Sequence, residues 1–527
     1  MKKNDDSATG IWKVISASSV GTMIEWYDFY IFGMLAKTIS TQFFPEGNTT
    51  AALLSTLAIF AAGFIVRPFG ALVFGRLGDL IGRKYTFLLT LVLMGGATFL
   101  IGLIPGYKTI GIAAPILVLL LRLLQGLALG GEYGGAATYV AEHAPANKRG
   151  YYTSWIQTTA TLGLFVALGV IMLVKLNMSD AAFNAEWGGW RYPFWVSIVL
   201  VGLSVYIRMN MSESPVFSKL KSSGNVSKNP LKESFSKKAN FKMVLLALFG
   251  AVMGQGVIWY TGQFYAQSFL ETKAGLEFEQ SRTIMLWGIA FATPFFVFWG
   301  WLSDKIGRKW IMMFGMLLGI LTYRPIFSEF LKDTKVNTNS AITITSADTT
   351  YINKDNITYQ TITSKGSNSD GLAFNKVEKN IAQPDTTFAD VIDENSNVIE
   401  KVFTVGTSYK QHEPTVYKDV VVSKSVYWKF VGLVFLLILY VTMVYGPIAA
   451  FLVEMFPTKI RYTSMSLPYH IGNGVFGGLV PFIGLLLTTT FPGNDLVGLW
   501  YPIGVATLCL IIGTIYLTNK IDNKVDD

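Results

Sequence analysis

The chain has 527 residues, of which 51% are hydrophobic and only 15% are charged, and its mean hydropathy is +0.42. Soluble domains usually carry about 25% charged residues, so this composition excludes an ordinary water-soluble protein. The net charge of +9 would fit a nucleic-acid-binding protein, but the basic residues lie in short loops between apolar runs, and we expect no nucleic-acid partner. One cysteine, Cys509, and three histidines exclude an intrachain disulfide and a Cys- or His-rich metal cluster.

Twelve apolar runs follow one another along the chain, each close to the ~20 residues that cross a bilayer as a helix. They lie near residues 14–38, 51–75, 85–105, 113–137, 152–175, 191–210, 243–270, 284–302, 309–328, 427–453, 464–488 and 497–518. Two polar segments interrupt the series. A lysine-rich segment, 211–242, separates six runs from six, and a segment rich in Thr, Asn, Ser and Asp, 329–425, lies between the ninth and tenth runs.

These runs predict an all-α membrane protein of twelve transmembrane helices in two six-helix halves. The first half is 1–210, the central loop is 211–242, the second half is 243–328 with 426–527, and 329–425 is an insertion. Lys and Arg concentrate in alternate short loops, which predicts that those loops are cytoplasmic. Both termini and the central loop are then cytoplasmic, the insertion is extracytoplasmic, and the expected location is the plasma (inner) membrane.

The insertion is open to two interpretations. Apolar residues alternate near Ile342 and Ile344, from Ile357 to Ile362, and near Val402, which predicts a small strand-rich domain. A polar, partly disordered loop is equally compatible with its low aliphatic content.

An internal repeat links the two predicted halves. GRLGDLIGRKY begins at Gly75 and GWLSDKIGRKW begins at Gly300, and each follows the second helix of its half. Parallel repeats of this kind build transporters whose solute lies between the halves. A loop that only sets topology would need basic residues but no aspartate at the same position. We therefore predict a conformational latch, in which each aspartate accepts hydrogen bonds from a helix end or pairs with the nearby arginine. Its residues are Gly75, Asp79, Arg83, Gly300, Asp304 and Arg308.

The sequence resembles the major facilitator superfamily. Besides the repeated loop, RLLQGLALGGE from Arg122 is similar to a motif of its proton-coupled members. GTMIEWYDFYIFG from Gly21, WRYPFW from Trp190, ESPVF from Glu213 and EMFPTKIRYTSMS from Glu454 resemble the metabolite:proton symporter branch, which includes osmoprotectant, shikimate, citrate and 2-oxoglutarate carriers. The resemblance covers nearly all of the chain except 329–425. We expect a monomer without a cofactor whose partners are a small solute, H⁺ and the lipid bilayer.

Few ionisable side chains lie inside the predicted helices, and such residues are costly and usually functional. Glu25 and Asp28 share one face of the first helix, and Arg122 lies at a similar depth. Arg67 and Glu132 both lie in the inner half of the membrane. We predict that Arg122 pairs with Glu25 or Asp28, and Arg67 with Glu132.

A buried carboxylate that gains and loses an arginine partner can change its protonation state. The predicted proton-coupling residues are therefore Glu25, Asp28, Arg122 and Glu132. The alternative is a static ion pair that only fixes helix packing.

The second half carries uncharged polar and aromatic residues in a stripe: Gln255, Trp259, Gln263 and Gln267 recur every four residues. Pockets combine apolar walls with a few convergent polar groups. The predicted substrate-binding residues of both halves are Tyr30, Arg67, Arg122, Gln125, Trp259, Tyr260, Gln263, His470 and Asn473. Any of them could instead form an interhelical hydrogen bond, and His470 could be a packing residue.

The predicted function is proton-coupled uptake of a small polar metabolite, either an organic acid or a zwitterionic osmolyte or amino acid, by alternating access. An exporter of amphiphilic compounds and a solute receptor that uses the insertion are the alternatives. The chain has no G-x-x-x-x-G-K-[ST] loop, which disfavours ATP-driven transport, and no nucleophile–base constellation, which argues against an enzyme.

Overall fold

The computed structural model describes residues 3–81, 83–131, 137, 140–141, 143–209, 236–337, 340–354, 357–369, 371–392, 398–456 and 461–519. The chain divides into two compact units. The helical unit comprises Met1–Ser268, Arg282–Ser328 and Phe430–Asp527, and the sheet unit comprises Phe269–Ser281 and Glu329–Lys429. The central loop predicted at 211–242 lies mostly outside the described residues.

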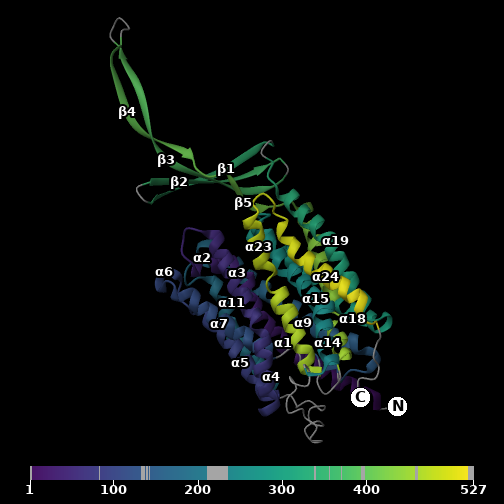
Figure 1. The fold of residues 1–527 in the computed structure, drawn as a ribbon. Helices are drawn as coiled ribbons and strands as arrows, with labels where there is room; N and C mark the ends of the chain where they lie inside the picture. Colours follow the sequence, from purple (N-terminus) through teal and green to yellow (C-terminus); the bar gives the residue numbers. More distant parts are fainter. Residues whose placement is uncertain are drawn as a thin grey trace. The chain divides into compact units, whose positions relative to one another are not determined.

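The first half of the helical unit is built from long helices joined by short ones (Figure 1). Its helices are α1 (Lys3–Met34), α2 (Ala36–Phe43), α3 (Thr49–Ile65), α4 (Arg67–Ile81), α5 (Arg83–Ile101), α6 (Tyr107–Ile110), α7 (Ala113–Gly130), α9 (Arg149–Leu176), α10 (Asp180–Asn184) and α11 (Tyr192–Met209). The Asn48 side chain caps α3 by accepting a hydrogen bond from Ala51 N at 2.9 Å. Glycines set the close packing of α7, since a Cβ at Gly126 would overlap the carbonyl oxygen of Gly63.

In the second half, two spans contain π-helical turns. The first runs through α14 (Lys238–Ala247), η3 (Leu248–Val252), α15 (Met253–Tyr260), η4 (Thr261–Tyr265) and α16 (Ala266–Thr272). The other runs through α22 (Arg461–His470), η5 (Ile471–Gly477) and α23 (Val480–Thr490). The remaining helices are α17 (Phe278–Ala292), α18 (Pro294–Ile306), α19 (Lys309–Thr334), α20 (Lys424–Tyr445), α21 (Ile448–Met455) and α24 (Trp500–Tyr516).

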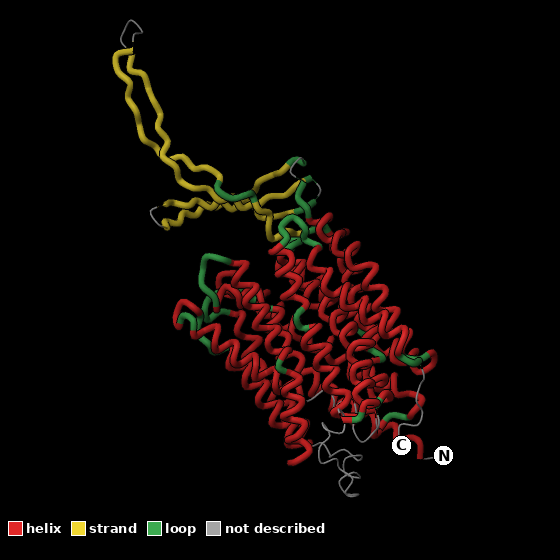
Figure 2. The backbone as a smooth tube through the Cα atoms, viewed as in Figure 1, coloured by secondary structure: helices red, strands yellow, loops and turns green. Residues whose placement is uncertain are grey.

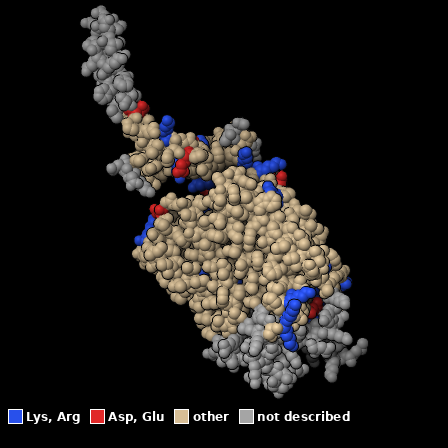
Figure 3. Space-filling view, in the orientation of Figure 1, with Lys and Arg blue, Asp and Glu red and all other residues tan. Residues whose placement is uncertain are grey.

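Within the described residues, nine helical segments are long and apolar enough to cross a membrane, and Leu89–Ile101 is a shorter apolar helix. The three other predicted spans, near 14–38, 85–105 and 191–210, coincide with α1, α5 and α11. The count of twelve stays a prediction. Figure 3 shows a face of the helical unit that is largely free of charged side chains. Helices satisfy every interior backbone group within themselves, as a lipid environment requires.

The sheet unit resolves the two interpretations of the insertion in favour of strands (Figure 2). Its strands are β1 (Ile342–Lys354), β2 (Ile357–Asn368), β3 (Ala373–Ile392), β4 (Val398–Gln411) and β5 (Val416–Val421). They form one antiparallel sheet in the order β1-β2-β3-β4, and β5 pairs with the first part of β3. Four apolar residues of this unit are buried: Leu276, Leu372, Phe374 and Val420. The strands predicted near Ile342, Ile357 and Val402 are confirmed.

Candidate solute and coupling site

Two fully buried arginines of the first half lie against the same aromatic ring. The guanidinium carbon of Arg67, at the start of α4, is 4.6 Å from the ring centroid of Phe29, and that of Arg122, on α7, is 4.1 Å from it. Arg67 also lies 4.2 Å from the ring of Phe64. A desolvated cation over an aromatic face gains ~2 kcal/mol, which offsets part of the cost of burying the charge.

Arg122 is held by neutral acceptors. Its Nη1 donates to Gln125 Oε1 at 2.9 Å, and its two Nη atoms lie 3.5 and 3.4 Å from the carbonyl oxygens of Phe29 and Phe60. Gln125 in turn donates from Nε2 to Thr98 Oγ1 at 2.6 Å. The predicted ion pair with Glu25 or Asp28 is absent among the described residues, because these neutral acceptors take its place. Gln125 therefore orients Arg122.

Some donor atoms of both arginines remain without a hydrogen-bond partner among the described residues: Nε and Nη2 of Arg67, and Nε of Arg122. Glu132, the predicted partner of Arg67, lies outside the described residues. Unsatisfied buried donors cost ~1–3 kcal/mol each, and more for charged groups. Such an arrangement suits an incoming acceptor such as a carboxylate.

Asp28 and Glu25 are both buried on α1. The Asp28 carboxylate lies beside the Ser197 hydroxyl of α11. A Cβ placed on Gly95 of α5 would lie 3.2 Å from Asp28 Oδ2, so this carboxylate faces α5. Both acids are near Phe29 in sequence. Arg122 lies against the backbone carbonyl of Phe29.

Aromatic residues of the second half meet those of the first half beside the arginines. The ring of Trp259 lies 5.5 Å from that of Tyr30 and 5.9 Å from that of Trp26, and Tyr260 lies 4.9 Å from Phe64. Trp26 and Tyr30 stack at 5.0 Å. These rings join residues far apart in sequence into one buried cluster.

Several polar groups of this region have no hydrogen-bond partner among the described residues. They are Tyr30 OH, Trp259 Nε1, Tyr260 OH, both amide atoms of Gln263 and both ring nitrogens of His470. The predicted residue Asn473 behaves differently. Its amide exchanges two hydrogen bonds with Gln255, at 3.1 and 2.9 Å, and also donates to Tyr469 O at 3.2 Å. Asn473 therefore joins η5 to α15, as an interhelical contact.

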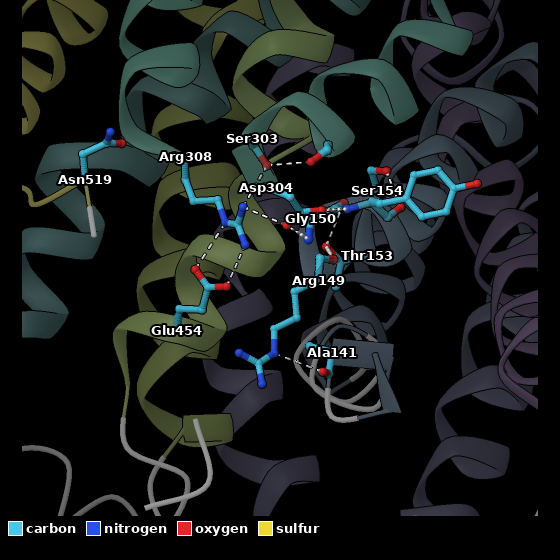
Figure 4. Close-up of polar contacts among 12 residues, drawn as sticks. Ala141, Arg149, Gly150, Thr153, Ser154, Ser303, Asp304, Arg308, Glu454 and Asn519 are labelled. Atoms are coloured by element: carbon cyan, nitrogen blue, oxygen red, sulfur yellow. Dashed lines mark hydrogen bonds and ion pairs between the residues drawn. The ribbon is translucent and has the colours of Figure 1, made fainter. Parts of the chain in front are cut away.

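A polar network joins the halves at one end of the helical unit (Figure 4). The Asp304 carboxylate accepts hydrogen bonds from Gly150 N and Tyr151 N, both at 2.8 Å, at the first turn of α9. Arg308 Nη1 lies 2.9 Å from Asp304 Oδ1, and Arg308 also binds Glu454 with two hydrogen bonds of 2.7 and 3.2 Å. A carboxylate is favourable at the positive end of a helix.

Gly300 lies against α9 beside this network. A Cβ at Gly300 would overlap the Ser154 side chain of α9. The first-half counterparts Gly75, Asp79 and Arg83 fall where the structure describes no side chains. Sequence reasoning expected a helix end as a partner of Asp304 but did not identify α9 as that helix, and it missed Glu454. Glu454 opens a motif that carried the family resemblance, but nothing in the motif indicates a contact with Arg308.

The comparisons with known proteins agree with this architecture. Residues 13–225 match the family described as sugar (and other) transporter. The inner membrane metabolite transport protein YhjE of Escherichia coli (strain K12) is 32% identical over 504 residues, 95% of this chain and 92% of that protein. Alpha-ketoglutarate permease of the same organism is 39% identical over 62% of this chain and 73% of that protein. Its proline/betaine transporter is 34% identical over 60% and 64%.

The fold resembles that of solved transporters. The D-xylose-proton symporter superposes with a TM-score of 0.62 over 98% of this chain and 99% of that chain, at 14% identity. Fold and sequence together define a multi-pass membrane transporter and not an enzyme. The chain belongs to the sugar (and other) transporter family of the major facilitator superfamily.

Proposed function

We propose that this transporter carries a small organic acid into the cell together with H⁺, by alternating access between two six-helix halves. The observation that supports it most is the pair of buried guanidinium groups, Arg67 and Arg122, on the ring of Phe29. Neither forms an ion pair with a described acidic residue, and both keep free donors. An anionic solute would supply the missing charge and acceptors.

The second half would complete the site with neutral groups. Trp259, Tyr260 and Gln263 lie on the span that contains the π-helical turn η4, and their polar atoms lack described partners. Aromatic walls with few convergent polar groups are typical of small-molecule sites. We assign them to the shape and orientation of the bound solute.

Proton coupling would use Asp28, with Glu25 as the second candidate. Asp28 is buried beside the Ser197 hydroxyl, its carboxylate faces α5, and it forms no ion pair with a described cation. Arg122 lies beside the neighbouring residue Phe29, so an anion bound to Arg122 would alter the electrostatic potential at Asp28. Release of the proton would follow opening toward the cytoplasm.

For orientation, we propose that both termini are cytoplasmic and that the sheet unit is extracytoplasmic, from the distribution of Lys and Arg in the short loops. Replacing Cys509 by serine gives a chain without cysteine. A cysteine at Thr350 on exposed β1 should then react with an impermeant thiol reagent on intact cells. Labelling only after lysis would contradict this orientation.

Thermal unfolding of the purified carrier with carboxylates, betaines and amino acids tests the solute class. A solute at 100 times its Kd stabilises the folded carrier by ~2.7 kcal/mol. We expect simple carboxylates to raise the Tm and the variant Arg67→Gln to cancel the rise. No rise with any carboxylate would contradict the proposal.

A zwitterion is the second candidate, because Trp26, Tyr30 and Trp259 are three mutually contacting rings close to Arg67. Rings of this kind bind quaternary ammonium groups. A rise in Tm with betaine but with no simple carboxylate would favour this candidate. The proline/betaine transporter and alpha-ketoglutarate permease among the relatives represent the two possibilities.

A further inference from the structure

The first transmembrane segment is interrupted near one end. Helix α1 ends at Met34 and α2 begins at Ala36, with Leu35 between them at φ −101° and ψ 13°. At this break, Nη2 of Arg282 donates a hydrogen bond to the carbonyl oxygen of Met34. Arg282 lies on α17 of the second half, so this hydrogen bond joins the two halves.

The contact combines charge with helix-end geometry. Arg282 is 1% exposed, and it places a cation at the C-terminal end of α1. That end carries the negative pole of the helix dipole, so a cation is favourable there. A hydrogen bond from a charged group contributes more than one between neutral groups, so loss of this contact is unfavourable. The interaction is therefore sensitive to separation of the halves.

Apolar residues close the same region. Ala36 of α2 and Leu57 of α3 form a buried cluster with Leu485 of α23, which again joins the first half to the second. Opening of the halves at this end would expose Ala36, a residue that is only 6% exposed in this structure.

Arg282 and Asp304 lie near opposite ends of one membrane span. The segment Phe278–Ile306 has 29 residues and contains α17 and α18, with Pro294 in the first turn of α18. At ~1.5 Å per residue the two side chains are separated by roughly 33 Å along the axis. Asp304 binds the N-terminal N–H groups of α9, and Arg282 binds the C-terminal carbonyl of α1. The acidic Asp304 therefore lies at the positive N-terminal end of α9, and the basic Arg282 lies at the negative C-terminal end of α1.

We propose that the span Phe278–Ile306 carries both gates of the transporter, with Arg282 as the gate opposite Asp304. Loss of the Arg282–Met34 contact opens the Arg282 end while the Asp304 contacts keep the other end closed, and loss of the Asp304 contacts does the reverse. The inference rests on the proposed alternating access, but it requires neither a particular solute nor proton coupling.

Cysteine labelling in purified carrier tests this inference without transport. In the Cys509→Ser background, Ala36→Cys reports on the Arg282 end and Ser154→Cys, on α9 against Gly300, reports on the Asp304 end. We expect Arg282→Gln to raise the maleimide reaction rate of Ala36→Cys about tenfold, the effect of one lost charge-assisted hydrogen bond, and to lower that of Ser154→Cys. Asp304→Asn should raise the reaction rate of Ser154→Cys and lower that of Ala36→Cys.

Arg191→Gln is the matched control. Arg191 is also buried and donates to a backbone carbonyl, Gly102 O at 2.8 Å, but both residues belong to the first half. This variant should lower the Tm without opposite changes at the two reporters. Arg282→Lys keeps the charge and should give a smaller increase at Ala36→Cys than Arg282→Gln. Equal increases at both reporters, or none at Ala36→Cys, would overturn the assignment. If the two reaction rates change in opposite directions as expected but no solute binds, the gate assignment remains valid and the proposed solute is refuted.

Discussion

The two halves of the helical unit contribute different chemistry to the region where they meet. The first half provides buried ionisable side chains on regular α-helices, namely Glu25, Asp28, Arg67 and Arg122. The second half provides neutral groups there, among them Trp259, Tyr260 and Gln263, on spans that contain π-helical turns. Charge is thus concentrated on one side, and uncharged aromatic and amide groups on the other.

This division indicates a division of tasks. Arg122 is fixed by Gln125, Thr98 and backbone carbonyls, so its charge is pre-positioned. π-helical turns occur frequently at functional sites and change the helix locally. We expect the first half to determine whether an anion binds and how protons move, and the second half to determine which anion fits.

The largest expected effect is at Arg122. Arg122→Ala should reduce uptake by at least ~100-fold, because it removes a buried charge that we assign to solute binding. Arg122→Lys should rescue little, since an ammonium group cannot reproduce the planar donor set of arginine. Uptake into proteoliposomes and the Tm of each variant provide the measurement. Arg324→Ala is the control, because Arg324 stacks on Trp500 at 4.8 Å, away from these contacts. Uptake by Arg122→Lys equal to that of the parent would contradict the assignment.

The second-largest effect is expected on the coupling of solute transport to proton transport. Asp28→Asn should abolish accumulation driven by a pH gradient, because the neutral amide cannot release a proton. Exchange of pre-loaded solute should survive, since exchange does not require the empty carrier to return deprotonated. Glu25→Gln tests the second candidate in the same assay. If both variants concentrate solute as the parent does, the proton site lies elsewhere, and Glu132 and His470 become the candidates.

A smaller effect is expected in the second half. Gln263→Ala should raise the KM by about tenfold with little change in Tm, because the Gln263 amide has no described partner and is assigned to the solute. Gln255→Ala, on the same stripe, should instead lower the Tm and leave the KM nearly unchanged, because Gln255 is paired with Asn473. An equal rise in KM for both variants would contradict the assignment of Gln263, but not Gln255, to solute binding.

The smallest effect is the coupling energy of the Gln255–Asn473 pair. Asn473→Leu leaves the buried Gln255 amide unpaired, and Gln255→Leu leaves the Asn473 amide only its hydrogen bond to Tyr469 O, each at a cost of ~1–3 kcal/mol. The double variant removes both amides and should cost less than the sum of the single variants. Thermal unfolding of the four proteins measures this difference. Simple additivity would show that the two amides do not interact in the membrane.

The sequence predicted the helical spans well because long apolar runs are a strong signal, and alternation predicted the strands of the sheet unit. It also identified Asp304 and Arg308 through the repeated loop. It did not predict the partners of Arg122, because a carboxylate at similar depth is an obvious candidate whereas a carbonyl such as Phe29 O carries no sequence signal. Arg282 was missed for the same reason, since its partner is the backbone of Met34.

Solute-driven proton flux tests the central proposal most directly. Proteoliposomes that contain the carrier and an internal pH indicator would receive an organic acid outside, at equal internal and external pH and with the membrane potential clamped. We expect internal acidification that saturates with the organic acid, disappears in Arg122→Ala and is lost in Asp28→Asn while solute exchange remains. Saturable solute entry without acidification, or acidification that persists in both Asp28→Asn and Glu25→Gln, would contradict it.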